Sequence, residues 1–109
     1  MRIALHNYRA DLAEALKSYV ERRVRFALHR FGSRVGQVTV RICGNGPAES
    51  SCRISTEILP FGRIAVEECD ADMFVAIDRA TGRISRLFGR ELERARDARA
   101  GRESIRLVA

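Results

Sequence analysis

Residues 37–69 alternate apolar and polar side chains with a period of two, in three consecutive runs. The first run, QVTVRIC at 37–43, places two valines and an isoleucine on one side; the second begins at Cys52 and the third ends at Cys69. The turn-forming segments GNGPAES and PFG separate the runs. Because a period of two is typical of strands that bury one face, this region predicts a three-stranded meander that must be covered on one side.

The segments on either side of the meander have a helical period. Apolar residues recur at three- and four-residue steps in residues 11–31, and Gly32 then ends this first predicted helix. The same steps recur from residue 70 to about residue 98, which predicts a second helix. Phe74 and Phe88 lie at the shoulder of the second stripe. The two apolar stripes consist of Leu12, Leu16, Val20, Val24, Ala27, Leu28 and Phe31, and of Met73, Ile77, Ala80, Ile84 and Leu87.

A short alternating strand, RIALH at 2–6, completes the pattern. The sequence therefore predicts an α+β fold of order β-α-β-β-β-α, in which a four-stranded sheet carries two helices packed on one face, as in double-stranded-RNA-binding domains. We expect this domain to span residues 1–98 and to be followed by a short flexible tail at 99–109. The opposite sheet face is expected to carry Thr39, Arg41, Arg53, Ser55, Glu57, Arg63 and Glu67.

Composition narrows the class of protein. The 109 residues are 46% hydrophobic and 31% charged, which is typical of one globular domain. No apolar run is long enough to span a bilayer, and the N-terminus lacks a signal-peptide core, so we expect a cytoplasmic protein without a membrane partner. The net charge of +6, carried almost entirely by arginine, favours a polyanionic partner. Three cysteines without close pairing favour free thiols over a disulfide framework, and Cys43 and Cys52 are not expected to pair.

Candidate catalytic or metal-binding residues do not converge in the sequence. Asp70 stands where a helix N-cap belongs, and Asp72 lies in the first turn, where the helix dipole favours negative charge. Asp78 lies on another side of the helix, so capping is favoured over a metal site. His6 and His29 have no neighbouring nucleophile motif. We therefore expect no enzymatic activity, no cofactor, no metal and no small-molecule substrate.

The arginines of the second helix form a regular row. Arg79, Arg83, Arg86 and Arg90 follow steps of four, three and four, which places them within a sector of roughly 60° beside the apolar stripe, and Arg94 extends the row. The row is either a solvated face or a phosphate-binding surface. No acidic residue is interspersed in its third and fourth turns, whereas solvated faces usually mix signs. The spacing therefore favours binding to phosphates.

The first helix offers a second row of Tyr19, Arg23, Phe26 and Arg30 with the same steps. Alternating basic and aromatic side chains are typical of surfaces that bind single strands, although the aromatic residues are equally compatible with packing at the edge of the core. Two adjacent rows of this kind would follow a phosphate backbone without reading its sequence, and salt would weaken such binding steeply.

The chain resembles the hibernation-promoting factor and ribosome-associated inhibitor family from residue 1 to about residue 96. The resemblance rests on ALKSYVERRVRFALHRF in the first helix, on VTVRI and CRIS in the strands, and above all on DADMFVAIDRATGRISR. In the last segment the matching positions are Asp72, Met73, Phe74, Ala76, Ile77 and Asp78. The sequence departs from the family at Phe26, where some relatives have lysine, and at Phe74, Gly82, Ser85, Leu87 and Gly89.

The resemblance implies a protein that binds the small ribosomal subunit and its rRNA in the channel used by mRNA and tRNA. Such binding would inhibit translation and promote ribosome hibernation under stress. The RNA-binding positions that carry over are Arg23, Arg79, Arg83, Arg86 and Arg90, with Arg30 as a looser match. The chain is expected to act as a short form, without the C-terminal dimerisation domain that pairs ribosomes. The alternative is a general RNA- or DNA-binding module without ribosome preference.

Overall fold

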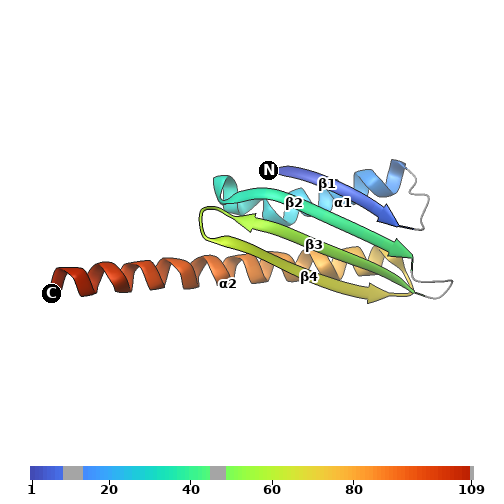
Figure 1. The fold of residues 1–109 in the computed structure, drawn as a ribbon. Helices are drawn as coiled ribbons and strands as arrows, with labels where there is room; N and C mark the ends of the chain where they lie inside the picture. The colour runs from blue at the N-terminus through green and yellow to red at the C-terminus, as the bar shows by residue number, and fades with distance from the viewer. Residues whose placement is uncertain (9–13, 45–48, 109) are drawn as a thin grey trace.

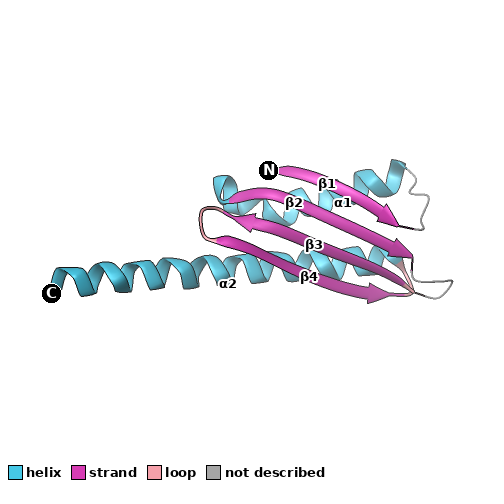
Figure 2. Cartoon of the chain, in the orientation of Figure 1, coloured by secondary structure: helices cyan, strands magenta, loops and turns pink. Residues whose placement is uncertain are grey.

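The computed structural model describes residues 1–8, 14–44 and 49–108. Its elements are β1 (Arg2–Tyr8), α1 (Glu14–Leu28), the 3₁₀ helix η1 (His29–Arg34), β2 (Val35–Gly44), β3 (Ser50–Ile58), β4 (Gly62–Asp70) and α2 (Met73–Val108). The four strands form one sheet in the order β1-β2-β3-β4, and both helices lie on the same face of it (Figures 1 and 2). The predicted fold class is confirmed.

The strand pairing follows from the connections between the strands. The α1 crossover makes β1 parallel to β2, and the shorter connections make β2, β3 and β4 antiparallel. Arg41 pairs with Arg53, and Arg53 pairs with Glu67, so these charged residues share the face that carries no helix. The polar face predicted by the alternation is thus present.

Cys43 and Cys52 lie on opposite faces of the sheet. Cys52 pairs with Ile42, and both are fully buried on the helix side, whereas Cys43 pairs with Ser51. Successive strand residues point to opposite sides, so the register keeps the two thiols apart. Burial raises the pKa of Cys52 to about 12, with a smaller contribution from Glu67.

A break in the register at the start of β2 sets which side chains reach the core. The pairing with β3 shifts between Val35 and Val38, and both valines are buried although an odd number of positions separates them. A Cβ atom on Gly36 would lie 2.9 Å from Cβ of Glu57, so only glycine fits here. The Glu57 carboxylate accepts a hydrogen bond from the backbone N–H of Gln37 at 2.8 Å.

The core lies between the helices and the sheet. Phe88, predicted at the shoulder of the α2 stripe, is fully buried and stacks on Phe31 with ring centroids 4.4 Å apart, whereas Phe74 is half exposed. The fully buried side chains of the two helices and the sheet are Val20, Val24, Leu28, Val38, Val40, Ile42, Cys52, Ile54, Thr56, Ala76, Ile77, Ala80, Thr81, Ile84 and Phe88. Both predicted stripes therefore face the sheet.

The first helix ends sooner than predicted. Residues 11–13 lie outside the described residues, and α1 ends at Leu28, after which η1 continues the chain as a tighter 3₁₀ turn. Gly32 lies inside η1 with φ +55°, a conformation that favours glycine. The N–H of Val35 donates to the carbonyl of Gly32, which turns the chain into β2.

The second helix ends later than predicted. It continues to Val108, so the expected end near residue 98 is wrong, and in Figure 1 the helix projects well past the sheet. Residues 90–108 consist mostly of arginine, glutamate, alanine and leucine without proline, and these residue types have high helix propensity. Gly101 costs only about 1 kcal/mol relative to alanine. The flexibility of residues 99–109 stays a prediction.

Candidate nucleic-acid interface

The acids that open α2 shape its first turn. Asp72 is the N-cap, because its side chain accepts a hydrogen bond from the N–H of Phe74 at 2.9 Å and its carbonyl accepts one from Ala76 at 3.1 Å. The predicted cap, Asp70, is wrong by two residues: it ends β4 and accepts a hydrogen bond from the N–H of Asp72 at 2.9 Å. Among the described residues, no group of three or more acidic, histidine or cysteine side chains is placed to hold a metal.

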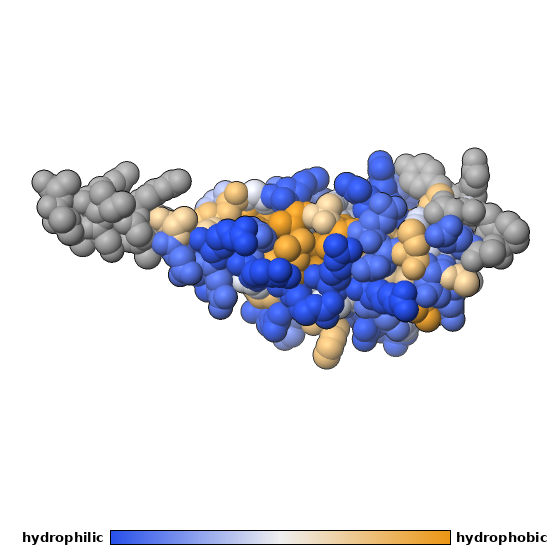
Figure 3. Space-filling view, turned by 90° about the horizontal axis from the view of Figure 1, so that it is seen from below, coloured by the Kyte–Doolittle hydropathy of each residue, from blue (hydrophilic) through white to orange (hydrophobic). Residues whose placement is uncertain are grey.

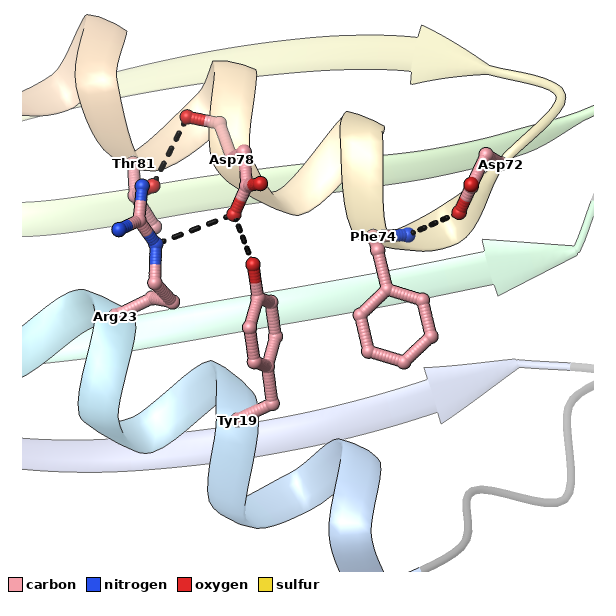
Figure 4. A network of polar contacts seen from close by, with 6 residues as sticks. All are labelled: Tyr19, Arg23, Asp72, Phe74, Asp78 and Thr81. Carbon is pink, nitrogen blue, oxygen red and sulfur yellow. Dashed lines mark hydrogen bonds and ion pairs between the residues drawn. The ribbon is translucent and has the colours of Figure 1, made fainter.

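Asp78 joins the two helices. The Tyr19 hydroxyl donates a hydrogen bond to Asp78 Oδ1, and Nε of Arg23 lies 3.1 Å from the same oxygen (Figure 4). The Arg23 contact is electrostatic, because this buried Nε makes no well-aligned hydrogen bond within the described residues. The hydrogen bond to Asp78, burial and the Asp78 charge all raise the pKa of Tyr19. Arg23 is therefore partly neutralised within the protein.

Tyr19 is also held by an aromatic contact. Its ring meets the ring of Phe74 edge to face, with centroids 5.0 Å apart. Together with the bond to Asp78, this contact fixes the orientation of the Tyr19 ring between α1 and the first turns of α2 (Figure 4). The sequence left open whether Tyr19 packs or binds, and the structure shows that it packs.

The arginine row of α2 divides into two halves. In the first half, Arg79 pairs with Asp70 at 3.2 Å, and Arg83 pairs with Glu68 at 3.3 Å. Arg83 also donates to the carbonyl of Glu67 at 3.3 Å. No acid lies between these arginines in the sequence, but β4 runs beside them and supplies the partners. The first half of the row is therefore compensated by acids, and the sequence argument from missing acids applied only to its third and fourth turns.

The second half keeps its charge. Arg86 and Arg90 are exposed and make no ion pair with any described residue. With Arg30 and Arg96 they line a cleft of about 590 Å³ between η1 and α2, in which Glu93 is the one acid. The rest of the cleft lining consists of Phe31, Gly89 and Leu92. We call this feature the arginine cleft.

Arg30 is fixed in the arginine cleft by contacts across the helices. Its guanidinium lies 4.6 Å from the centroid of the Phe31 ring, and Nη2 donates to Ser85 Oγ at 3.2 Å. A Cβ atom on Gly89 would lie 3.6 Å from Phe31 and 3.8 Å from Arg30 Nη2. These are ordinary van der Waals distances, so the η1 side chains lie against α2 at Gly89 without requiring glycine there. A Cβ atom on Gly82 would lie 3.5 Å from Nη1 of Arg86, which is also an ordinary contact distance, so the structure does not require glycine at this position.

Sequence reasoning misplaced the end of the row. Arg94, expected to extend it, pairs with Glu91 at 3.5 Å and lines a different hollow of about 240 Å³ beside β4. Arg96 enters the arginine cleft in its place. The sequence does contain a sign of this position: Arg96 follows Gly89 by seven residues, or about two helical turns, which places both on the same side of α2.

The hollow beside β4 is mostly apolar. It is lined by Ile58, Phe61 and Ile64 from the β3–β4 hairpin and by Ala95 and Ala98 from α2. Figure 3 views the molecule from below, where apolar side chains are visible among hydrophilic ones. The arginine cleft lies on the other flank of α2, where η1 approaches it.

Comparisons with known proteins identify the family. Residues 3–96 match the family described as Sigma 54 modulation protein / S30EA ribosomal protein. The chain belongs to this family. The S30EA match confirms the resemblance seen in the sequence, and it supports a ribosomal partner. No curated protein matches the chain in sequence.

Two solved structures share the S30EA fold with this chain. The N-terminal domain of Thermus thermophilus Protein Y is 27% identical with a TM-score of 0.72, and the match covers 83% of this chain and 98% of that one. A ribosomal subunit interface protein from Coxiella burnetii is 14% identical with a TM-score of 0.74, and the match covers 85% of this chain and 99% of that one.

Within the described residues, no helix is long and apolar enough to cross a membrane.

Proposed function

We propose that this chain is a non-enzymatic, ribosome-associated inhibitor of translation. It binds the rRNA of the small ribosomal subunit in the channel used by mRNA and tRNA, and so promotes ribosome hibernation in the cytoplasm. The observation that carries the proposal is the arginine cleft in a member of the S30EA family. Four arginines share the cleft with one glutamate, so the described lining has an excess of positive charge.

The geometry of the arginine cleft suits the successive phosphates of a nucleic-acid strand better than a single small anion. The arginine cleft is open, and its guanidinium groups come from both η1 and α2, so they can contact successive phosphates of a strand. Such contacts release counterions and add binding energy without reading sequence. A protein that occupies the channel in this way excludes mRNA and tRNA by its volume alone.

The paired arginines contribute less than those of the cleft. Arg79 and Arg83 are more than half exposed and each uses one nitrogen on an acid. Exposed ion pairs of this kind are worth about 0–1 kcal/mol, so a phosphate can compete with the acid. Arg23 is less exposed than these two arginines, and its buried Nε faces Asp78. We therefore rank the RNA-binding residues as Arg30, Arg86 and Arg90 first, then Arg79 and Arg83, and Arg23 last.

Co-sedimentation with purified small subunits in sucrose gradients, at about 50 and 200 mM salt, tests the proposal. The double variant R86E/R90E is expected to lose binding and inhibition of translation. The matched control R53E/R63E makes the same change in net charge on the open sheet face and is expected to bind normally. Equal loss in both variants would show that net charge, not the arginine cleft, controls binding.

Competition with bulk duplex RNA separates ribosome recognition from general nucleic-acid binding. We expect small subunits to displace duplex RNA at equal phosphate concentration. Displacement in proportion to phosphate alone would favour the general module and refute a ribosome-specific role.

A further inference from the structure

Phe26 is the most exposed large hydrophobic residue of the described chain. Its exposed fraction is 80%, whereas Val24 and Leu28, two positions to either side, are fully buried. A ring in this position contributes almost nothing to the core, and single exposed apolar residues are common on protein surfaces. Its surroundings, not its exposure, indicate a binding role.

Phe26 forms one wall of a hollow built on a fixed ring. The hollow has a volume of about 310 Å³ and is lined by Tyr19, Arg22, Arg23 and Phe26. Asp78 and Phe74 hold Tyr19 in place. Two aromatic rings and the carbon stems of two arginines therefore form an apolar hollow whose rim is positively charged.

The charge on the rim decides between possible occupants. An apolar protein surface seated on Phe26 would bury the guanidinium group of Arg22, which pairs with no described acid, and burying a charge without a partner is costly. An unpaired nucleotide brings both components that the hollow accepts, since its base stacks on an aromatic ring and its phosphate meets an arginine.

The hollow also lies close to the arginine cleft. Arg30, which lines that cleft, follows Phe26 by four residues and lies at the start of η1, directly after α1 ends at Leu28. A strand whose phosphates contact Arg30 can therefore place a neighbouring base on Phe26.

We propose that Phe26 and the hollow beside it bind one unpaired nucleotide of single-stranded RNA, with the base on the Phe26 ring and the phosphate at Arg22 or Arg23. The proposal rests on the proposed function in taking RNA as the partner. The stacking contact would distinguish single-stranded RNA from duplex RNA, whereas the arginine cleft recognises only the negative charge of the phosphates.

Tryptophan fluorescence tests the stacking directly. The chain contains no tryptophan, so F26W introduces a single reporter, and A65W on the exposed open sheet face is the control. We expect a single-stranded RNA oligomer to quench F26W, and we expect neither an abasic strand of equal length nor a duplex to do so. Equal quenching by the abasic strand, or equal quenching of A65W, would overturn the proposal.

Binding to small subunits gives the second readout. F26A is expected to bind roughly 5- to 150-fold more weakly, F26Y to bind like the wild type, and F26L to bind like F26A. Normal binding by F26L would indicate an apolar protein contact instead and overturn base stacking. If F26A and the wild type both bind small subunits equally well, base stacking on Phe26 is refuted and the proposed function stands. If the wild type binds no subunits while F26W is quenched by single strands alone, the proposed function fails and stacking stands.

Discussion

The contact of Asp78 with Tyr19 and Arg23 predicts that stability and RNA binding respond differently to one substitution. D78N keeps the shape of the side chain and removes its charge. The ion pair with Arg23 is worth at most about 1 kcal/mol, because its two side chains are 40% and 45% exposed. The Tyr19 hydroxyl would then donate to a neutral oxygen, and losing the charge assistance costs about 1 kcal/mol more.

D78N should therefore lower the free energy of unfolding by about 1–2 kcal/mol, which corresponds to a fall in Tm of roughly 5–10 °C. Urea denaturation followed by circular dichroism measures the free energy. Combining D78N with Y19F forms a double-mutant cycle, in which we expect a coupling of about 1 kcal/mol. D97N removes an exposed acid from the same helix and should change stability by less than about 0.5 kcal/mol.

The same substitution should not weaken binding to small subunits. Removing the Asp78 charge releases Arg23 and adds positive potential at the hollow beside Phe26, so the affinity is expected to rise slightly. Two results would refute this reasoning: unchanged stability in D78N, which would mean that Asp78 does not join the helices, or weakened binding in a folded D78N, which would mean that its charge serves the RNA site.

Two further predictions concern the core. F88A removes a fully buried ring stacked on Phe31 and should cost about 3–5 kcal/mol in urea denaturation; a loss under about 1 kcal/mol would contradict its central position. The pKa of the Cys52 thiol in the folded state is about 12, above its ordinary value of 9. The folded state therefore binds the thiol proton more tightly than the unfolded state does, and the protonated thiol contributes its full stability below pH 9. That contribution, up to about 4 kcal/mol, should be lost as the pH rises from 9 to 12. C52A should flatten the decline in that window, and identical pH profiles for the two proteins would show that Cys52 does not titrate there.

Much of the fold could be predicted from the sequence because its signals are local. Period-two alternation in residues 37–69 and three- and four-residue steps in the helices determine which faces are apolar, and both apolar faces lie in the core. Helix ends were less predictable. The N-cap of α2 is Asp72 and not the predicted Asp70, because β4 extends through Asp70. The extension of α2 to Val108 depends on helix propensity alone, since no apolar stripe marks it.

The candidate site was only partly predictable. The spacing of Arg79, Arg83, Arg86 and Arg90 places them on one side of α2, but pairing partners from another element leave no signal in that spacing. Arg96 and Phe31 belong to the arginine cleft because η1 approaches α2 there, which is a long-range contact that a one-dimensional pattern does not contain.

Residue periods alone predict a sheet covered by two helices, with arginines presented along one of them. Which of those arginines keep their charge depends instead on how distant segments pack together. The order of the strands places β4 beside the first half of the row, where Asp70 and Glu68 compensate Arg79 and Arg83. It leaves Arg86 and Arg90 facing η1, where no described acid pairs with them. Ion pairing depends on distances of a few ångströms between distant segments, and only folding fixes those distances.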